Sequence, residues 1–219
     1  MPNLLQVGPQ VATDLQAVNQ RGDNYGNTTI QEAGAYYQEA VRRGYGFIYS
    51  QAAAGVALAV PASGASTNFM IWNPTRSGKW FVPCKITLGI VSTTAVLGNL
   101  ALYYVPDAGD GIGTTARIAS FTAATPVNAL VGQSSPVSAM NFAPAVENIT
   151  GGATFLKTLG WTILANDLTG KNMQTFETDL QGSLIFKPGT AMVVACSTAI
   201  ASVCVISCFG LEIPAPAGA

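Results

Sequence analysis

Apolar and polar residues alternate over most of the chain after residue 44, as in β-strands that bury one face. The clearest case is the segment 80–92, whose odd positions include Lys85 and Thr87. Its even positions are all apolar: Trp80, Val82, Cys84, Ile86, Leu88 and Ile90. We therefore expect a strand that buries its even face. The other segments with a strand pattern are 45–51, 55–60, 68–72, 99–105, 116–122, 154–165, 182–187, 191–197 and 201–213.

One helix is expected before these strands, from about Ile30 to Arg43. Thr29 and Glu32 form a capping box, and Gly44 supplies a C-terminal stop. The apolar stripe of this helix is narrow, so it could lie over a sheet or dock on a neighbouring subunit. The candidate partner-binding residues are Ile30, Tyr36, Tyr37, Val41, Arg42 and Arg43.

Three segments have little periodicity. Residues 1–27 have the composition of an extended arm, 166–179 that of a loop, and 106–152 that of a long loop with only the short strand at 116–122. Long loops of this kind are often functional, so the contact surface is expected in the arm and in the 106–152 loop. The expected organisation is an arm and helix over 1–44, a β-sandwich over 45–214 and a tail over 215–219.

The stretch 189–211 carries no charge and could span a bilayer by length alone. It is nevertheless rich in Ser, Thr, Cys and Val and is interrupted near Ser197. Apolar residues then recur at every second position: Val203, Val205, Phe209, Leu211 and Ile213. This pattern favours two buried strands joined by a turn over a membrane helix. With strand connections of uneven length, the whole chain is expected to be mainly β, a single jelly-roll-like antiparallel sandwich.

Composition narrows the possible partners. Charged residues make up 10% of the chain, and the net charge is −1. Such a surface loses little solvation when another protein covers it, which favours protein partners. The densest basic site is the pair Arg42 and Arg43, so the clustered cations that nucleic acid requires are missing from the sequence.

Catalytic chemistry is poorly supported. The chain has no histidine, which is the commonest proton-transfer group and metal ligand. Its four cysteines form no CxxC pair and are expected to be buried apolar residues. Asp107 and Asp110 could contribute to a Ca²⁺ loop, but the remaining ligands of such a loop are missing, so an ordinary turn is the preferred interpretation. A facing pair of carboxylates, as in a glycosidase, stays open from sequence, but we expect no enzyme, cofactor or metal site.

The turn Asn73-Pro74-Thr75-Arg76-Ser77-Gly78-Lys79, with Ile71 before it and a long strand after it, forms an I-x-N-P-x-x-S-G-K pattern. This pattern resembles jelly-roll structural proteins of tailed bacteriophages. The last two expected strands, which end with Glu212, are similar to the closing strands of those proteins. The resemblance covers residues 68–105 and 191–213 and carries over no catalytic residue.

The resemblance implies a virion component made in the host cytoplasm, such as a head decoration (cement) protein. Its partners would be the major capsid protein and further copies of itself, commonly as a homotrimer. Two related alternatives stay open: a tail or spike component that binds a host glycan, and a jelly-roll coat protein that builds the shell itself. A carbohydrate-active enzyme is the alternative from another class.

Overall fold

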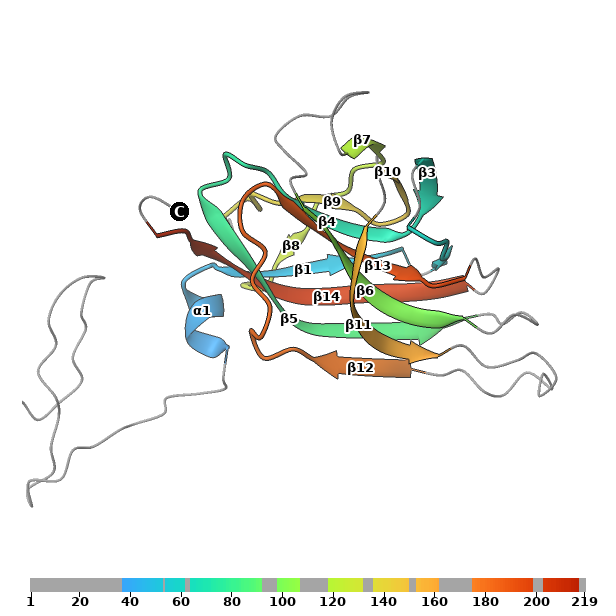
Figure 1. The fold of residues 1–219 in the computed structure, drawn as a ribbon. Helices are drawn as coiled ribbons and strands as arrows, with labels where there is room; N and C mark the ends of the chain where they lie inside the picture. Colours follow the sequence, from blue (N-terminus) through green and yellow to red (C-terminus); the bar gives the residue numbers. More distant parts are fainter. Residues whose placement is uncertain are drawn as a thin grey trace, which may run out of the picture. The chain divides into compact units, whose positions relative to one another are not determined.

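Antiparallel β-sheets dominate the computed structural model (Figure 1). The structure describes residues 37–52, 54–61, 64–91, 98–106, 118–131, 136–149, 153–161, 175–198 and 203–216. The chain divides into two units, Met1–Gln38 and Glu39–Ala219. The expected arm, Thr29, Ile30 and Tyr36 lie outside the described residues, as does the Asp107–Asp110 segment.

Eight strands form the sandwich of the second unit. The first sheet contains β1 (Gly46–Ser50), β5 (Lys79–Ile90), β12 (Thr175–Asp179) and β14 (Val203–Pro214). The second contains β4 (Phe69–Asn73), β6 (Asn99–Val105), β11 (Thr154–Trp161) and β13 (Thr190–Cys196). The strand orders are β12-β5-β14-β1 and β11-β6-β13-β4, with antiparallel neighbours. The first strand pairs with the last, and successive strands alternate between the two sheets except for β6 and β11, which are neighbours in the second sheet. This arrangement is a jelly roll, as expected.

Shorter strands extend these sheets. β2 (Val56–Ala57) and β8 (Val127–Asn128) join the first sheet, and β9 (Asn141–Ala143) pairs with β4 in the second. A third small sheet has the order β3-β10-β7 and contains β3 (Gly64–Thr67), β7 (Ile118–Phe121) and β10 (Val146–Ile149). In the part of the chain that the structure describes, no helix is long and apolar enough to cross a membrane.

The core lies between the two large sheets. Phe47, Tyr49, Phe69, Phe81 and Phe142 are among its largest buried side chains. Their rings meet edge to face: Tyr49 lies 5.3 Å from Phe81 and 5.6 Å from Phe142 between ring centroids. A second buried cluster contains Trp72.

The turn between β4 and β5 forms as the sequence predicts. Nδ2 of Asn73 donates 2.8 Å hydrogen bonds to the carbonyl oxygens of Lys79 and Phe186. The Ser77 hydroxyl donates to Oδ1 of Asn73, and Gly78 adopts a positive φ of 64°. Asn73 therefore ties the turn to a segment more than a hundred residues away in sequence, which fixes the corner of the sandwich.

The prediction that β5 buries its even-numbered face holds for only part of the strand, because a β-bulge interrupts it. Lys85 pairs with Phe209 of β14, whereas Pro83 pairs with Gly210, so Cys84 is an extra residue. An extra residue reverses the side to which the following side chains point. Ile86, Leu88 and Ile90 enter the core as predicted, but before the bulge it is Phe81 that joins the core cluster. Trp80 is only half-buried, and Val82, although buried as predicted, lies outside that cluster.

The apolar row that the sequence shows on β14 is not the more deeply buried row of that strand. The two strands of the 189–211 stretch form as predicted, but the odd-numbered row of β14 is only half-buried. The even-numbered row is fully buried: Cys204, Ile206, Cys208, Gly210 and Glu212. The apolar periodicity of this strand therefore marks the outer face of the sheet.

Several expected loops and strands need correction. The predicted loop 166–179 ends in β12, whose inward Phe176 packs against the core. The predicted strand 182–187 is a turn, with positive φ at Gln181 and Gly182, followed by a single bridge from Phe186 to Phe81. The 106–152 segment contains β8, β9 and β10 in addition to the expected strand at β7.

The described part of the expected helix is α1 (Gln38–Arg42). It ends at Gly44, as predicted, with φ +76°. Two hydrogen bonds close the end: Gly44 N–H to the Val41 carbonyl and Tyr45 N–H to the Ala40 carbonyl, both 2.9 Å. This pair of bonds is the Schellman motif, in which a left-handed glycine satisfies the last helical carbonyls.

Candidate protein-binding surface

A row of apolar side chains crosses the outer face of the first sheet. Val127 of β8 pairs with Ile48 of β1, which pairs with Phe209 of β14. Because paired residues in adjacent strands point to the same side, the three side chains lie next to one another. Val127 is 60% exposed and Ile48 is 38% exposed, and Phe209 is half-buried. This half of the sheet thus presents aliphatic and aromatic surface to solvent.

The same row becomes charged on the other half of the sheet. Phe209 pairs with Lys85 of β5, and Lys85 pairs with Asp179 of β12. Nζ of Lys85 also lies 2.7 Å from Oε1 of the exposed Glu177. The outer face is therefore divided into an apolar half over β8, β1 and β14 and a charged half over β5 and β12.

The end of α1 lies on the apolar half. A Cβ atom built on Gly46 would lie 2.8 Å from Cγ2 of Val41, 3.2 Å from Cε2 of Phe209 and 3.3 Å from Cβ of Ala129. Gly46 therefore leaves the space that these three side chains occupy. Val41, predicted from sequence as a contact residue, packs beside Phe209 and is half-buried.

The segment after β8 continues this surface. Nδ2 of Asn128 donates a 3.0 Å hydrogen bond to the Gly44 carbonyl, and Pro136 Cγ would lie 2.8 Å from a Cβ on Gly44. Val131 and Val137 in this segment are 80% and 83% exposed. The two regions expected to contact partners, the helix and the 106–152 segment, are therefore adjacent where the structure describes them.

We call this surface the apolar patch, and it consists of Val41, Ile48, Val127, Val131, Val137 and Phe209. Of the other residues predicted from sequence, Arg42 and Arg43 are exposed at the end of α1, and Tyr37 is half-buried. Sequence reasoning missed Ile48 and Val127, because only strand pairing shows that they share a row with Phe209.

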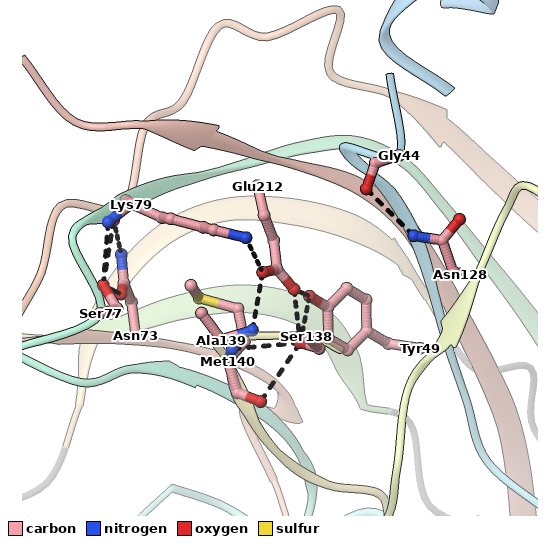
Figure 2. A network of polar contacts seen from close by, with 10 residues as sticks. All are labelled: Gly44, Tyr49, Asn73, Ser77, Lys79, Asn128, Ser138, Ala139, Met140 and Glu212. Atoms are coloured by element: carbon pink, nitrogen blue, oxygen red, sulfur yellow. Dashed lines mark hydrogen bonds and ion pairs between the residues drawn. The ribbon is translucent and has the colours of Figure 1, made fainter. Parts of the chain in front are cut away.

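A buried polar network surrounds Glu212 of β14 (Figure 2). Glu212 is fully buried, and its Oε1 accepts hydrogen bonds from the Tyr49 hydroxyl, at 2.7 Å, and from the Ser138 hydroxyl. Its Oε2 accepts from the Ala139 N–H at 2.8 Å and lies 3.6 Å from Nζ of Lys79. Burial of Tyr49, followed by the charge of Glu212, raises the pKa of Tyr49 well above its ordinary value. A buried carboxylate requires partners of this kind, and here they join three elements.

An apolar hollow of about 260 Å³ lies elsewhere on the domain. Its lining residues are Tyr104, Leu156, Leu184, Ile185, Phe186, Lys187 and Thr190. Ile185 is 53% exposed at this site. Among the described residues, no group of three or more Cys, Asp or Glu side chains is placed to hold a metal ion. Neither the hollow nor the patch thus brings together an obvious set of reactive groups.

Comparison with known proteins gave no match: no protein-family model, no curated protein and no solved structure matches the chain. The geometry described above is therefore the basis for a functional assignment.

Proposed function

We propose that this chain is a virion structural protein that binds neighbouring shell subunits, as a capsid decoration (cement) protein does. The observation that carries the proposal is the apolar row Val127–Ile48–Phe209 on the solvent face of a sheet. Apolar patches of this kind, bordered by polar residues, are typical of protein interaction sites. The major capsid protein is the proposed partner, and further copies of the chain are the second.

The jelly-roll topology and the low charge support the same proposal. Jelly rolls recur in viral capsid proteins, although they also occur in lectin domains and cupins, so the fold alone does not decide function. A patch of neutral side chains can be desolvated against a partner without stranding a buried charge. A trimer would strengthen attachment further, because the second and third contacts become intramolecular.

A glycan-binding tail component is less well supported. Sugar sites are often lined by exposed aromatic rings. Among the described residues, the large exposed apolar side chains are aliphatic except for Phe155. A jelly-roll coat protein that builds the shell is a second candidate, since the strand order β12-β5-β14-β1 and β11-β6-β13-β4 supports it equally.

Quantitative mass spectrometry of purified particles tests the proposal. A copy number comparable to that of a separate major shell protein is expected for decoration. A copy number that accounts for the shell alone would identify a coat protein, and a few copies per particle would identify a tail component. Absence of the chain from particles would overturn the structural role altogether.

A further inference from the structure

The segment between β8 and β9 connects the two sheets and carries part of the apolar patch. β8 pairs with β1 in the first sheet, and β9 pairs with β4 in the second. On its outer side the segment exposes Val131 and Val137, and on its inner side Met140 is 4% exposed within the core. The position of Val137 in the patch therefore depends on how the neighbouring residues of this segment are held from inside.

On the inner side, two residues of this segment bind the same carboxylate. Glu212 accepts hydrogen bonds from the Ser138 hydroxyl and the Ala139 N–H, and the Ser138 Oγ in turn accepts from the Met140 N–H at 3.1 Å. Figure 2 shows the Glu212 side chain directed at this segment, with Tyr49 beside it. Glu212 is fully buried, so its contact with this segment lies in the interior of the domain.

We propose that the ionised Glu212 carboxylate is an acid-sensitive latch that fixes residues 136–140, and that protonation of Glu212 releases them. Its effect on partner binding rests on the function proposed above, whereas the release itself does not. Glu212 positions Val137 of the patch and, because it is buried, does not contact the partner.

The chemistry of the contacts makes ionisation the deciding variable. An ionised carboxylate only accepts hydrogen bonds, and the Tyr49 O–H, the Ser138 O–H and the Ala139 N–H all donate to it. A protonated carboxyl has to place its own hydrogen against one of these donors. It also loses its attraction to Lys79, whose Nζ lies 3.6 Å away.

The other titratable groups around Glu212 do not account for the proposed response to acid. Tyr49 faces it from β1 and Lys79 from β5, and Cys208 lies near Tyr49 on β14 itself. The described part of 136–140 contributes a hydroxyl and backbone groups, with no ionisable side chain. Because burial raises the pKa of Tyr49, its hydroxyl stays protonated and continues to donate through the acidic and neutral range.

Amide hydrogen exchange of the isolated full-length chain tests the latch. Rates at Ala139 and Met140, corrected for intrinsic chemistry, are compared at about pH 7 and at about pH 3.5. We expect these amides to exchange at least about tenfold faster at the lower pH, as after loss of a charge-assisted hydrogen bond. Amides of β13 report whether the whole domain has opened.

Glu212→Gln should show the fast exchange already at neutral pH, because the amide cannot replace the charge. Glu177→Gln is the matched control, since Glu177 is exposed and pairs with Lys85 on the outer face. It should behave like the parent chain. Unchanged protection at Ala139 in Glu212→Gln, with the domain folded, would overturn the latch.

Ser138→Ala keeps the test decisive if Glu212→Gln does not fold. This variant keeps the Glu212 carboxylate and removes its hydrogen bond from the Ser138 hydroxyl. Amide exchange at Ala139 should therefore accelerate at neutral pH while the amides of β13 stay protected. Unaltered exchange at Ala139 would contradict the proposal. The exchange experiment uses the isolated chain without a partner. Absence of the chain from virions would therefore refute the proposed function without affecting the exchange result.

Discussion

The hydroxyl of Tyr49 on β1 donates a 2.7 Å hydrogen bond to Oε1 of Glu212 on β14, and both side chains are fully buried. This bond connects adjacent strands to the segment that carries Val137. Tyr49→Phe keeps the ring and removes the donor. We expect it to lower the free energy of unfolding by about 1.5–3 kcal/mol, the range for hydrogen bonds to charged groups. Denaturant titration at neutral pH measures the difference, and equal stability would show that the bond contributes nothing.

The raised pKa of Tyr49 predicts how stability depends on alkaline pH. Below about pH 10 the phenol is neutral in the folded and unfolded states, so its contribution is fully present. Above that pH the unfolded chain loses the proton first, and stability falls until the folded Tyr49 also ionises. Tyr49→Phe lacks this component, so its stability should fall less steeply above about pH 10. Parallel stability curves for the two chains would contradict the assignment.

Alanine substitutions at Gly44 and Gly78 distinguish the cost of backbone strain from the cost of disturbed packing. Both glycines have positive φ, at 76° and 64°. A Cβ on Gly44 would lie 2.8 Å from Cγ of Pro136, whereas a Cβ on Gly78 would meet no atom within 4 Å. Gly78→Ala should therefore cost only about 1–2 kcal/mol of strain. Gly44→Ala should cost more, as measured by chemical denaturation, and a cost no greater than that of Gly78→Ala would argue against close packing between the end of α1 and Pro136.

The four cysteines are free and buried, as the sequence predicted. Burial raises the pKa of Cys204 to about 12 and also raises that of Cys208 and Cys196. Because the thiolate is the reactive form, the native chain should not react with Ellman's reagent at about pH 8. The unfolded chain should release the full four equivalents. Rapid labelling of the native chain would show that at least one thiol is accessible.

The fold class could be predicted because local signals agree with it. The alternating pattern placed most sandwich strands, the Asn73–Lys79 turn formed where its residues indicated, and Gly44 ended the helix. Which face of each strand is buried was harder to predict. The bulge at Cys84 reverses β5, and it exists only as a mismatch with β14, so no local pattern on β5 reveals it.

The proposed binding surface was even harder to predict from the sequence. Val205, Phe209 and Leu211 were expected to be buried because they are apolar, yet they lie on the half-buried outer face. Glu212 occupies an inward position that a sequence pattern would assign to an apolar residue. Its burial depends on Tyr49, Lys79 and Ser138, which are distant in sequence and are brought together only by the completed fold.

The most direct test of the account is binding of the chain to phage shells prepared without it. Val127→Asp places a charge in the centre of the apolar patch, where desolvation would oppose binding. Val91→Asp is the matched control, because Val91 is 45% exposed and lies outside the patch. Both variants should fold, since neither valine belongs to the core. The account predicts that Val127→Asp weakens attachment at least about tenfold, roughly the effect of one well-buried aliphatic contact, whereas Val91→Asp binds like the parent chain. Equal binding of all three chains would contradict it.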